Sequence, residues 1–306
     1  MNRILLPLAA ALSLLLQGCF FTGVESTPKI TAGDVRREET PLTREDTFLT
    51  SVADAPPATW RPGKEFVVTD PRISRVFDID DAAGEALAGR TIRFAGMSES
   101  AGVTGSGVTD ILFTSPSGEA LVYRVNRPLA RLADEKSLSV PFTIQRDMAE
   151  AADRAMRGLK VYTLTGVWRD PADNPVRGLK FVPVTIDSVS TGNALFPLKV
   201  AFTDANGHIG CLFIYPGAKD SAPRTFGSVF SFGDPRKRYP SISDENWELI
   251  TRGRVTQGMT TLECRLALGN PKEVNRGATQ SYLRETWSYE NGRYLLFEDG
   301  LLKTIR

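Results

Sequence analysis

The strongest fold signal in this chain is a succession of short segments that are rich in β-branched and aromatic residues and separated by turn residues. Such segments are typical of strands, and the short spacers between them suit hairpins. They predict a mainly β protein, built of small β-barrel-like or open-sheet units. The predicted strands are residues 64–70, 90–97, 109–114, 119–125, 159–168, 179–186, 198–203 and 208–215.

One helix is predicted within this region, over the segment RDMAEAADRAMRG. Asp147 is its expected N-cap and Gly158 its stop, and an apolar face carries Met148, Ala152, Ala155 and Met156. The helix divides the region into a first β unit, residues 60–144, and a second β unit, residues 145–232, which it leads.

Two predicted hairpins resemble each other. The spacing from Phe113 to Gly118 equals that from Phe202 to Gly207, so both turns place a glycine identically. In the second turn, Asn206-Gly207 is expected to supply positive φ angles. The likeness indicates two related β units, and chance similarity between hairpins is the alternative.

The C-terminal residues 241–306 predict a separate α+β domain. Ser243 is the expected N-cap of a first helix that ends at Gly253, and Thr260 with Glu263 forms a capping box for a second helix that ends at Gly269. Strands follow at 283–290, 293–298 and 301–306, joined by Asn291-Gly292 and Asp299-Gly300. Two such turns in succession predict a three-stranded meander. One face of this sheet is expected to be covered by Trp247, Leu262 and Leu266.

The first eighteen residues have the pattern of a secretory signal peptide. An apolar run over residues 4–16 would be about 20 Å long as a helix, whereas a bilayer core is roughly 30 Å thick. The run ends in Leu16-Gln17-Gly18-Cys19, which resembles the lipobox of bacterial lipoproteins. The resemblance implies cleavage before Cys19 and an anchor of fatty acyl chains such as palmitate on its thiol. The alternative is an ordinary signal peptide with an incidental cysteine.

The resemblance to lipoproteins also implies a cellular address. No aspartate follows Cys19 and no acidic run follows it closely, which favours the outer membrane, with the chain facing the periplasm. Residues 19–59 are expected to form a lipid-anchored tether, because residues 22–47 are polar and charged.

The C-terminal segments GMTTLECRLALGNPKEV and ETWSYENGRYLLFEDGLL resemble the SmpA/OmlA (BamE-like) outer-membrane lipoprotein domain. The resemblance implies a fold shared with β-lactamase-inhibitor proteins. The best-known member of the BamE-like family helps to assemble outer-membrane β-barrels. As a whole, the chain resembles uncharacterised exported lipoproteins of Bacteroidetes. The matching positions are Gly258, Met259, Thr260, Arg265, Leu268, Gly269, Pro271, Trp287, Tyr289, Phe297 and Gly300.

Charge and cysteine content narrow the possible partners. With 37 Lys and Arg against 36 Asp and Glu, the chain has a net charge of +1, so no bulk field attracts nucleic acid and no such partner is expected. Export would place Cys211 and Cys264 in an oxidising compartment, where a disulfide between them is one possibility. The other is that both are small core residues, since Cys264 falls at the N4 position of a hydrophobic staple with Met259.

The sequence contains no recognisable catalytic constellation. His208 is the single histidine, is expected to be a solvated residue at a strand start, and no nucleophile motif accompanies it. Residues 78–87 have acids at alternate positions like a calcium loop but lack its closing glutamate, so a solvated loop is expected. Residues 102–107 lack the Lys-Ser/Thr ending of a phosphate loop. We therefore expect no catalytic, cofactor or metal residue, and no enzyme.

The expected function is a lipid-anchored binding or assembly module of the cell envelope with a protein partner. One alternative is a hydrolase of envelope polymers that uses a pair of carboxylates brought together by the fold. Another is an inhibitor of an envelope enzyme, which the shared fold suggests. An aromatic binding face is possible at Trp287, Tyr289 and Tyr294, although these residues could equally pack against the two helices.

Overall fold

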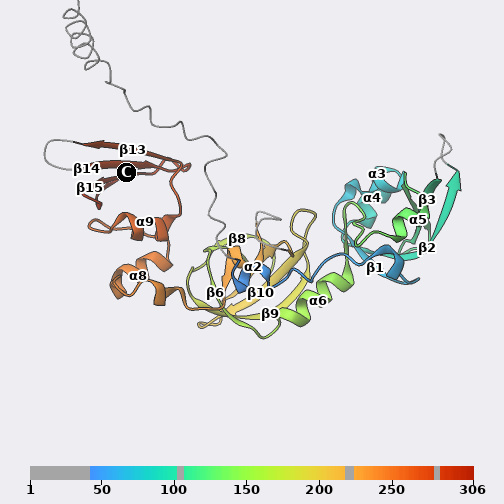
Figure 1. Ribbon diagram of the computed structural model, residues 1–306, viewed down its shortest axis with the longest axis horizontal. Helices are drawn as coiled ribbons and strands as arrows, with labels where there is room; N and C mark the ends of the chain where they lie inside the picture. Colours follow the sequence, from blue (N-terminus) through green and yellow to red (C-terminus); the bar gives the residue numbers. More distant parts are fainter. Residues whose placement is uncertain (1–41, 102–106, 218–223, 279–282) are drawn as a thin grey trace, which may run out of the picture. The chain divides into compact units, whose positions relative to one another are not determined.

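The computed structural model describes residues 42–101, 107–217, 224–278 and 283–306, and it contains three antiparallel sheets in these ranges (Figure 1). Cys19 and the predicted signal peptide lie outside the described residues. The predicted mainly β class is confirmed. Within the described ranges, no helix combines the length and the hydropathy needed to cross a bilayer.

The first sheet has five strands in the order β4-β3-β2-β1-β5. Its core is aromatic: the ring of Phe66 lies 4.9 Å from that of Trp60 and 5.1 Å from that of Phe113. The sheet is open, since β4 and β5 are free edges. Its strands are β1 (Glu65–Val68), β2 (Thr91–Ala101), β3 (Gly107–Thr114), β4 (Ala120–Val125) and β5 (Thr143–Gln145). Its helices are η1 (Pro57–Thr59), η2 (Pro71–Ile73), α3 (Ser74–Phe77), α4 (Asp81–Leu87) and α5 (Leu129–Ala133).

Residues 78–87 correct one expectation. Residues 81–87 form helix α4 rather than a solvated loop, because the Asp80 side chain accepts a hydrogen bond from the amide of Ala83 and so caps the helix. The acidic spacing that resembled a calcium loop is therefore an N-cap followed by an acidic first turn.

The second sheet has seven strands in the order β12-β6-β9-β10-β11-β7-β8. The segment 159–168, predicted as one strand, is two: β6 and β7 have different neighbours in the sheet, with residues 164–166 between them. The strands are β6 (Lys160–Thr163), β7 (Val167–Arg169), β8 (Pro175–Arg177), β9 (Pro183–Thr191), β10 (Leu198–Asp204), β11 (Ile209–Ile214) and β12 (Phe230–Ser231). The helices of this region are α2 (Arg44–Thr47), α6 (Arg146–Met156), α7 (Phe226–Val229) and η3 (Pro235–Arg238).

Helix α6 covers part of this sheet with Met148, Ala152 and Met156, as predicted, whereas Ala155 is exposed. Its N-cap is Gln145 rather than Asp147. The helix begins two residues earlier than predicted because Gln145 ends strand β5, which pairs with β1, and the helix follows it directly. Asp147 instead forms an ion pair with Lys64.

The folded part of the chain begins before residue 60. Leu49 and Val52 are buried in the core of the seven-stranded sheet, and the Phe48 ring lies 4.7 Å from that of Phe226. The Glu45 carboxylate accepts a hydrogen bond of 3.0 Å from the amide of Phe232. Residues 42–59, predicted as part of the tether, are therefore folded: residues 42–52 pack on the seven-stranded sheet, and Ala55 packs against the core of the five-stranded sheet.

The two hairpins predicted to match do share one turn geometry. In the first, the Gly118 amide bonds to the Ser115 carbonyl at 3.0 Å, and in the second the Gly207 amide bonds to the Asp204 carbonyl at 3.1 Å. Both glycines have positive φ, +92° and +82°. Asn206 does not, so only the glycine takes the left-handed conformation, contrary to the expectation for Asn-Gly.

The C-terminal region consists of two helices and a four-stranded sheet, and the helices lie on one side of it (Figure 1). The predicted meander is present as β14–β16, and strand β13, which the sequence did not indicate, extends it. The elements are α8 (Asp244–Thr251), α9 (Thr261–Leu268), β13 (Glu273–Ala278), β14 (Leu283–Ser288), β15 (Tyr294–Glu298) and β16 (Leu301–Ile305).

The predicted caps of these helices are confirmed. Ser243 accepts from the Asn246 amide, and Thr260 and Glu263 make both bonds of a capping box. Trp247 and Leu266 pack on the core as expected, but Leu262 is 47% exposed and faces away from it. Cys211 and Cys264 are buried free thiols, consistent with the prediction that they are core residues.

Candidate functional site

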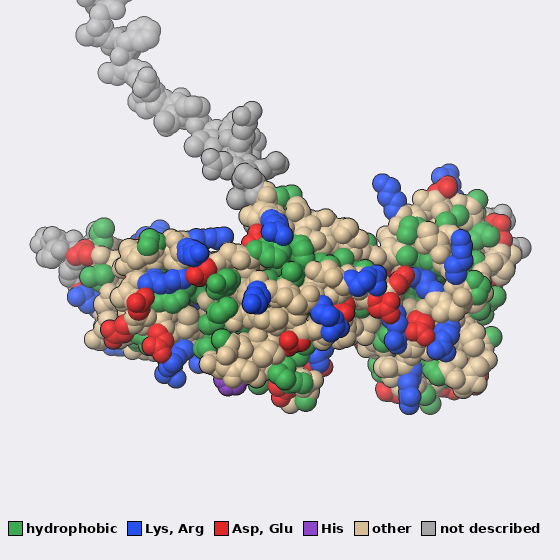
Figure 2. All heavy atoms as spheres, turned by 90° about the horizontal axis from the view of Figure 1, so that it is seen from below, with side chains coloured by type: hydrophobic (Ala, Val, Ile, Leu, Met, Phe, Trp, Pro, Cys, Tyr) green, Lys and Arg blue, Asp and Glu red, His purple; other side chains and the backbone are tan. Residues whose placement is uncertain are grey.

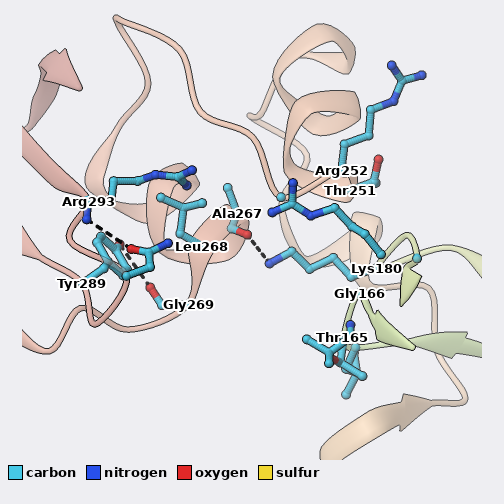
Figure 3. Close-up of a pocket in the computed structure, with 16 residues that line it drawn as sticks. Thr165, Gly166, Lys180, Thr251, Arg252, Ala267, Leu268, Gly269, Tyr289 and Arg293 are labelled. Atoms are coloured by element: carbon cyan, nitrogen blue, oxygen red, sulfur yellow. Dashed lines mark hydrogen bonds between the residues drawn. The ribbon is translucent and has the colours of Figure 1, made fainter. Parts of the chain in front are cut away.

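A basic cleft of about 390 Å³ lies between the seven-stranded sheet and the C-terminal region (Figure 3). We define it by its lining residues. They are residues 164–167, 177, 178, 180, 251–253, 267–269, 289, 291 and 293.

The sheet wall of the cleft depends on Gly178. Its amide donates a hydrogen bond of 2.9 Å to the carbonyl of Gly166, which joins the end of β8 to the segment before β7. A Cβ atom at Gly178 would lie 1.9 Å from the Trp168 ring, so only glycine fits there. The close approach of the backbone to this buried ring directs the chain toward the C-terminal helices.

Lys180 and Phe181 join the two walls. The Lys180 amide donates a hydrogen bond of 3.0 Å to the carbonyl of Thr251, at the end of α8. Phe181 has a φ of +60° and stacks on Trp247 with ring centroids 5.5 Å apart. A left-handed conformation costs a residue with a side chain about 1–2 kcal/mol, which this packing offsets.

The Lys180 side chain extends from the sheet wall toward α9, where its ammonium donates a hydrogen bond to the carbonyl oxygen of Ala267 (Figure 3). Ala267 is in the last turn of α9, where carbonyl groups lack helical partners and a cation is favourable. Burial lowers the pKa of Lys180 from 10.5 to about 8. The side chain is therefore mostly protonated at neutral pH but close to its titration.

Three arginines complete the positive lining, and no carboxylate side chain contributes to it. Arg252 is paired with Glu248 at 2.6 Å, and its side chain points away from Lys180 in Figure 3. Among the described residues, Arg177 and Arg293 have no ion-pair partner. The cleft therefore carries a net positive charge, and a positively charged concave site concentrates anions.

The opposite wall adds apolar and aromatic surface. The Tyr289 hydroxyl donates a hydrogen bond of 3.4 Å to the Gly269 carbonyl, and burial raises the pKa of Tyr289 to about 12. Leu164 and Leu268 also line the cleft. Of the aromatic residues predicted for a binding face, Tyr289 alone lies in the cleft: Trp287 is fully buried in the core, and Tyr294 is 51% exposed elsewhere.

No sequence pattern predicts the cationic residues of the cleft. Arg177, Lys180, Arg252 and Arg293 belong to segments far apart in the chain, and no motif connects them. Gly178 and Gly253 were the available indication of this site, because they follow the ends of β8 and α8 and both line the cleft.

His208 is solvated, as predicted: its side chain is 73% exposed. Its Nδ1 lies 3.0 Å from Asp204 Oδ2. Burial acts to raise the pKa of Asp204, but hydrogen bonds from the backbone and side chain of His208 and from the Asn206 amide outweigh it and lower the pKa. This pair closes a hairpin turn, so its geometry is structural.

A second cavity of about 370 Å³ is lined by Asp54, Ser139, Met148 and Tyr215 among others. Burial raises the pKa of Asp54, whose carboxylate accepts a hydrogen bond from Ser139. Asp54 is its single carboxylate, so neither this cavity nor the basic cleft holds the paired carboxylates of the predicted alternative hydrolase. The described residues contain no cluster of three potential metal ligands.

The surface outside the cleft has no extended charged patch on the face drawn in Figure 2. Lys and Arg side chains alternate there with Asp and Glu. In comparisons with protein-family models, with curated proteins and with solved structures, no match was found.

Proposed function

We propose that this chain is a lipid-anchored protein of the cell envelope that binds a partner protein through the basic cleft. In this proposal Cys19 carries the acyl chains, the anchor lies in the outer membrane, and the folded region faces the periplasm. The protein acts as a binding or assembly module and not as an enzyme.

The observation that carries the binding proposal is the composition of the cleft. It combines four cationic side chains, an aromatic ring and two leucines without any carboxylate. Arg252 is paired with Glu248, but Arg177 and Arg293 have no ion-pair partner among the described residues, and uncompensated cations of this kind are typical of binding surfaces for anionic groups. The hydroxyls of Thr251 and Tyr289 donate to the backbone carbonyls of Glu248 and Gly269 rather than to a side-chain base, an arrangement that does not favour nucleophilic catalysis.

The C-terminal region supports the assembly role. Two capped helices followed by an antiparallel sheet agree with the domain that the sequence resembles, and Met259, Trp287 and Phe297 are core residues of it. The role of that family in outer-membrane assembly therefore belongs to this proposal.

The partner is tested by crosslinking in cells. A photoreactive amino acid replaces Asn291 at the exposed rim of the cleft, and Ser117, in an exposed turn of the first sheet, serves as the matched control. We expect a specific crosslinked protein, identified by mass spectrometry, from position 291 and not from position 117. Recovery of barrel-assembly proteins would support the assembly role, and identical products from both positions would refute the cleft as the binding site.

The anchor is tested separately by labelling cells with a radioactive fatty acid. The wild-type chain should incorporate label, and Cys19→Ala should not. Equal incorporation by both would refute the anchor and leave the binding proposal to its own experiment.

A further inference from the structure

We infer that the basic cleft recognises an acidic peptide segment, whose carboxylates bind Arg177 and Arg293 while its amide groups face the carbonyl ends of α8 and α9. This inference rests on the proposed function and names the chemistry of the partner.

Two arginines of the cleft are available to bind a carboxylate. Arg177 ends strand β8 on the sheet wall, and Arg293 precedes β15 on the opposite wall. Among the described residues neither has a carboxylate within ion-pair distance. A guanidinium is a planar fork that binds a carboxylate through two parallel hydrogen bonds. Two such groups on facing walls suit a ligand with more than one carboxylate.

Helices α8 and α9 both end at the cleft. The C-terminal ends of α8 and α9 contribute Thr251, Gly253, Ala267, Leu268 and Gly269 to the cleft. Helix C-termini carry partial negative charge, so they disfavour a compact dianion such as phosphate, which helix N-termini bind. The carbonyl oxygens of Thr251, Ala267 and Gly269 already accept one hydrogen bond each from Lys180 or Tyr289, and the second lone pair of each can accept another. A peptide meets both requirements, because it carries N–H donors between its acidic side chains.

The size and the apolar surface of the cleft also favour a peptide ligand. A cleft of about 390 Å³ is within the range of sites that hold a small organic ligand or a few side chains. Leu164, Leu268 and the ring of Tyr289 give it apolar area that an inorganic anion would not use. The concave shape also differs from the exposed polybasic surface that attracts an anionic membrane.

The test uses the full chain in a neutral detergent and a fluorescein-labelled peptide of alternating glutamate and leucine. Fluorescence polarisation measures its affinity for wild type, Arg177→Gln and Arg293→Gln. Arg238→Gln, at an exposed arginine outside the cleft, is the matched control. We expect each cleft variant to bind about tenfold more weakly, the usual effect of losing one charged hydrogen bond, and the control to bind as wild type.

Competition distinguishes the other ligand classes. A peptide with glutamine in place of glutamate should bind at least about tenfold more weakly. Inorganic phosphate and vesicles containing phosphatidylglycerol should not displace the acidic peptide at equal total negative charge. Equal binding of the glutamine peptide, unchanged affinity of both arginine variants, or displacement by phosphate or vesicles would each overturn the inference.

The two proposals fail in different ways. If position 291 yields a specific crosslink but the acidic peptide does not bind, the binding function stands and the acidic-peptide inference is wrong. If the crosslinks from positions 291 and 117 are identical, the binding function fails whatever the peptide does.

Discussion

The ring of Phe181 stacks on the indole of Trp247, with centroids 5.5 Å apart and an interplanar angle of 28°. Phe181 follows Lys180, which bonds to the ends of both α8 and α9, and the ring packs against the core of the C-terminal region. These two consecutive residues therefore fix the sheet wall of the cleft to its helical wall. Both the stability of the C-terminal region and the shape of the cleft depend on them.

Replacing Phe181 should destabilise the protein in two separable ways. Phe181→Ala removes the stacked ring and should lower the free energy of unfolding by about 2–3 kcal/mol, less than for a fully buried phenylalanine. Phe181→Gly removes the same ring but tolerates the φ of +60°, so it should be more stable than the alanine variant by about 0.5–1 kcal/mol. Urea unfolding followed by tryptophan fluorescence measures both. An alanine variant as stable as the glycine variant would contradict the strained conformation.

Lys180 should make stability depend on pH. Its pKa is about 8 in the folded state and 10.5 as the ordinary value, so between these pH values the unfolded chain binds more protons than the folded chain. The free energy of unfolding should therefore rise with pH in this window, by about 1–2 kcal/mol from pH 7.5 to 9.5 relative to Lys180→Met. Arg177, Arg252 and Arg293 line the same cleft and are present in both proteins, so they do not enter the difference between wild type and Lys180→Met.

The measurement compares urea unfolding of wild type and Lys180→Met at the two pH values. The methionine variant also removes a donor to the Ala267 carbonyl, so its stability at one pH is not diagnostic, but the difference between pH values is. Parallel pH profiles for the two proteins would contradict a lowered pKa.

Gly178 should tolerate no side chain. In Gly178→Ala the new methyl group would lie 1.9 Å from the Trp168 ring, so the backbone or the indole must move, at a cost of about 3 kcal/mol or more. Gly233→Ala is the matched control, because a Cβ there meets nothing within 4 Å. Thermal unfolding should show a large drop in Tm for the first variant and a change within about 1 °C for the second. Equal Tm values for the two variants would show that Trp168 does not restrict this position.

Both buried cysteines should be unreactive in the folded protein. Burial raises the pKa of Cys264 to about 12 and also raises that of Cys211, so little thiolate forms at neutral pH. In a Cys19→Ala chain, a thiol reagent at neutral pH should react slowly in buffer and with both thiols in urea. If urea without a reductant released no reactive thiol, the two cysteines would be bonded after all.

Local chemistry made the C-terminal elements predictable. Thr260 and Glu263 cap α9, and Asp299 and Gly300 both have the positive φ angles of a two-residue hairpin. The five-residue turn that contains Asn291-Gly292 was harder to predict. There the Asn291 side chain accepts from the Arg293 amide, and only Gly292 has positive φ. Asn291-Gly292 therefore lies in a longer loop than the two-residue turn that was predicted, because the flanking residues also decide the turn type.

Tertiary pairing explains the elements that the sequence did not indicate. Strand β13 has the sequence EVNRGA, which is polar and contains glycine, and it is a strand because all six of its residues pair with β14. The cleft depends on the same kind of information. Its cations come from β8, the segment after it, the C-cap of α8 and a late hairpin. Their proximity arises from the packing of Phe181 on Trp247 and from the hydrogen bonds of Lys180 to Thr251 and Ala267.

Because Leu49 and Val52 are buried in the core of the seven-stranded sheet, a force that pulls on the chain from its N-terminal side would act first on this sheet. Tension applied to the chain ahead of Leu42 would reach α2 first and would be resisted by the hydrogen bond from the Phe232 amide to Glu45. Rupture there would uncover the rings of Phe226 and Phe232, which pack against the ring of Phe48. Under such a force the seven-stranded sheet would thus open first at its β12 edge.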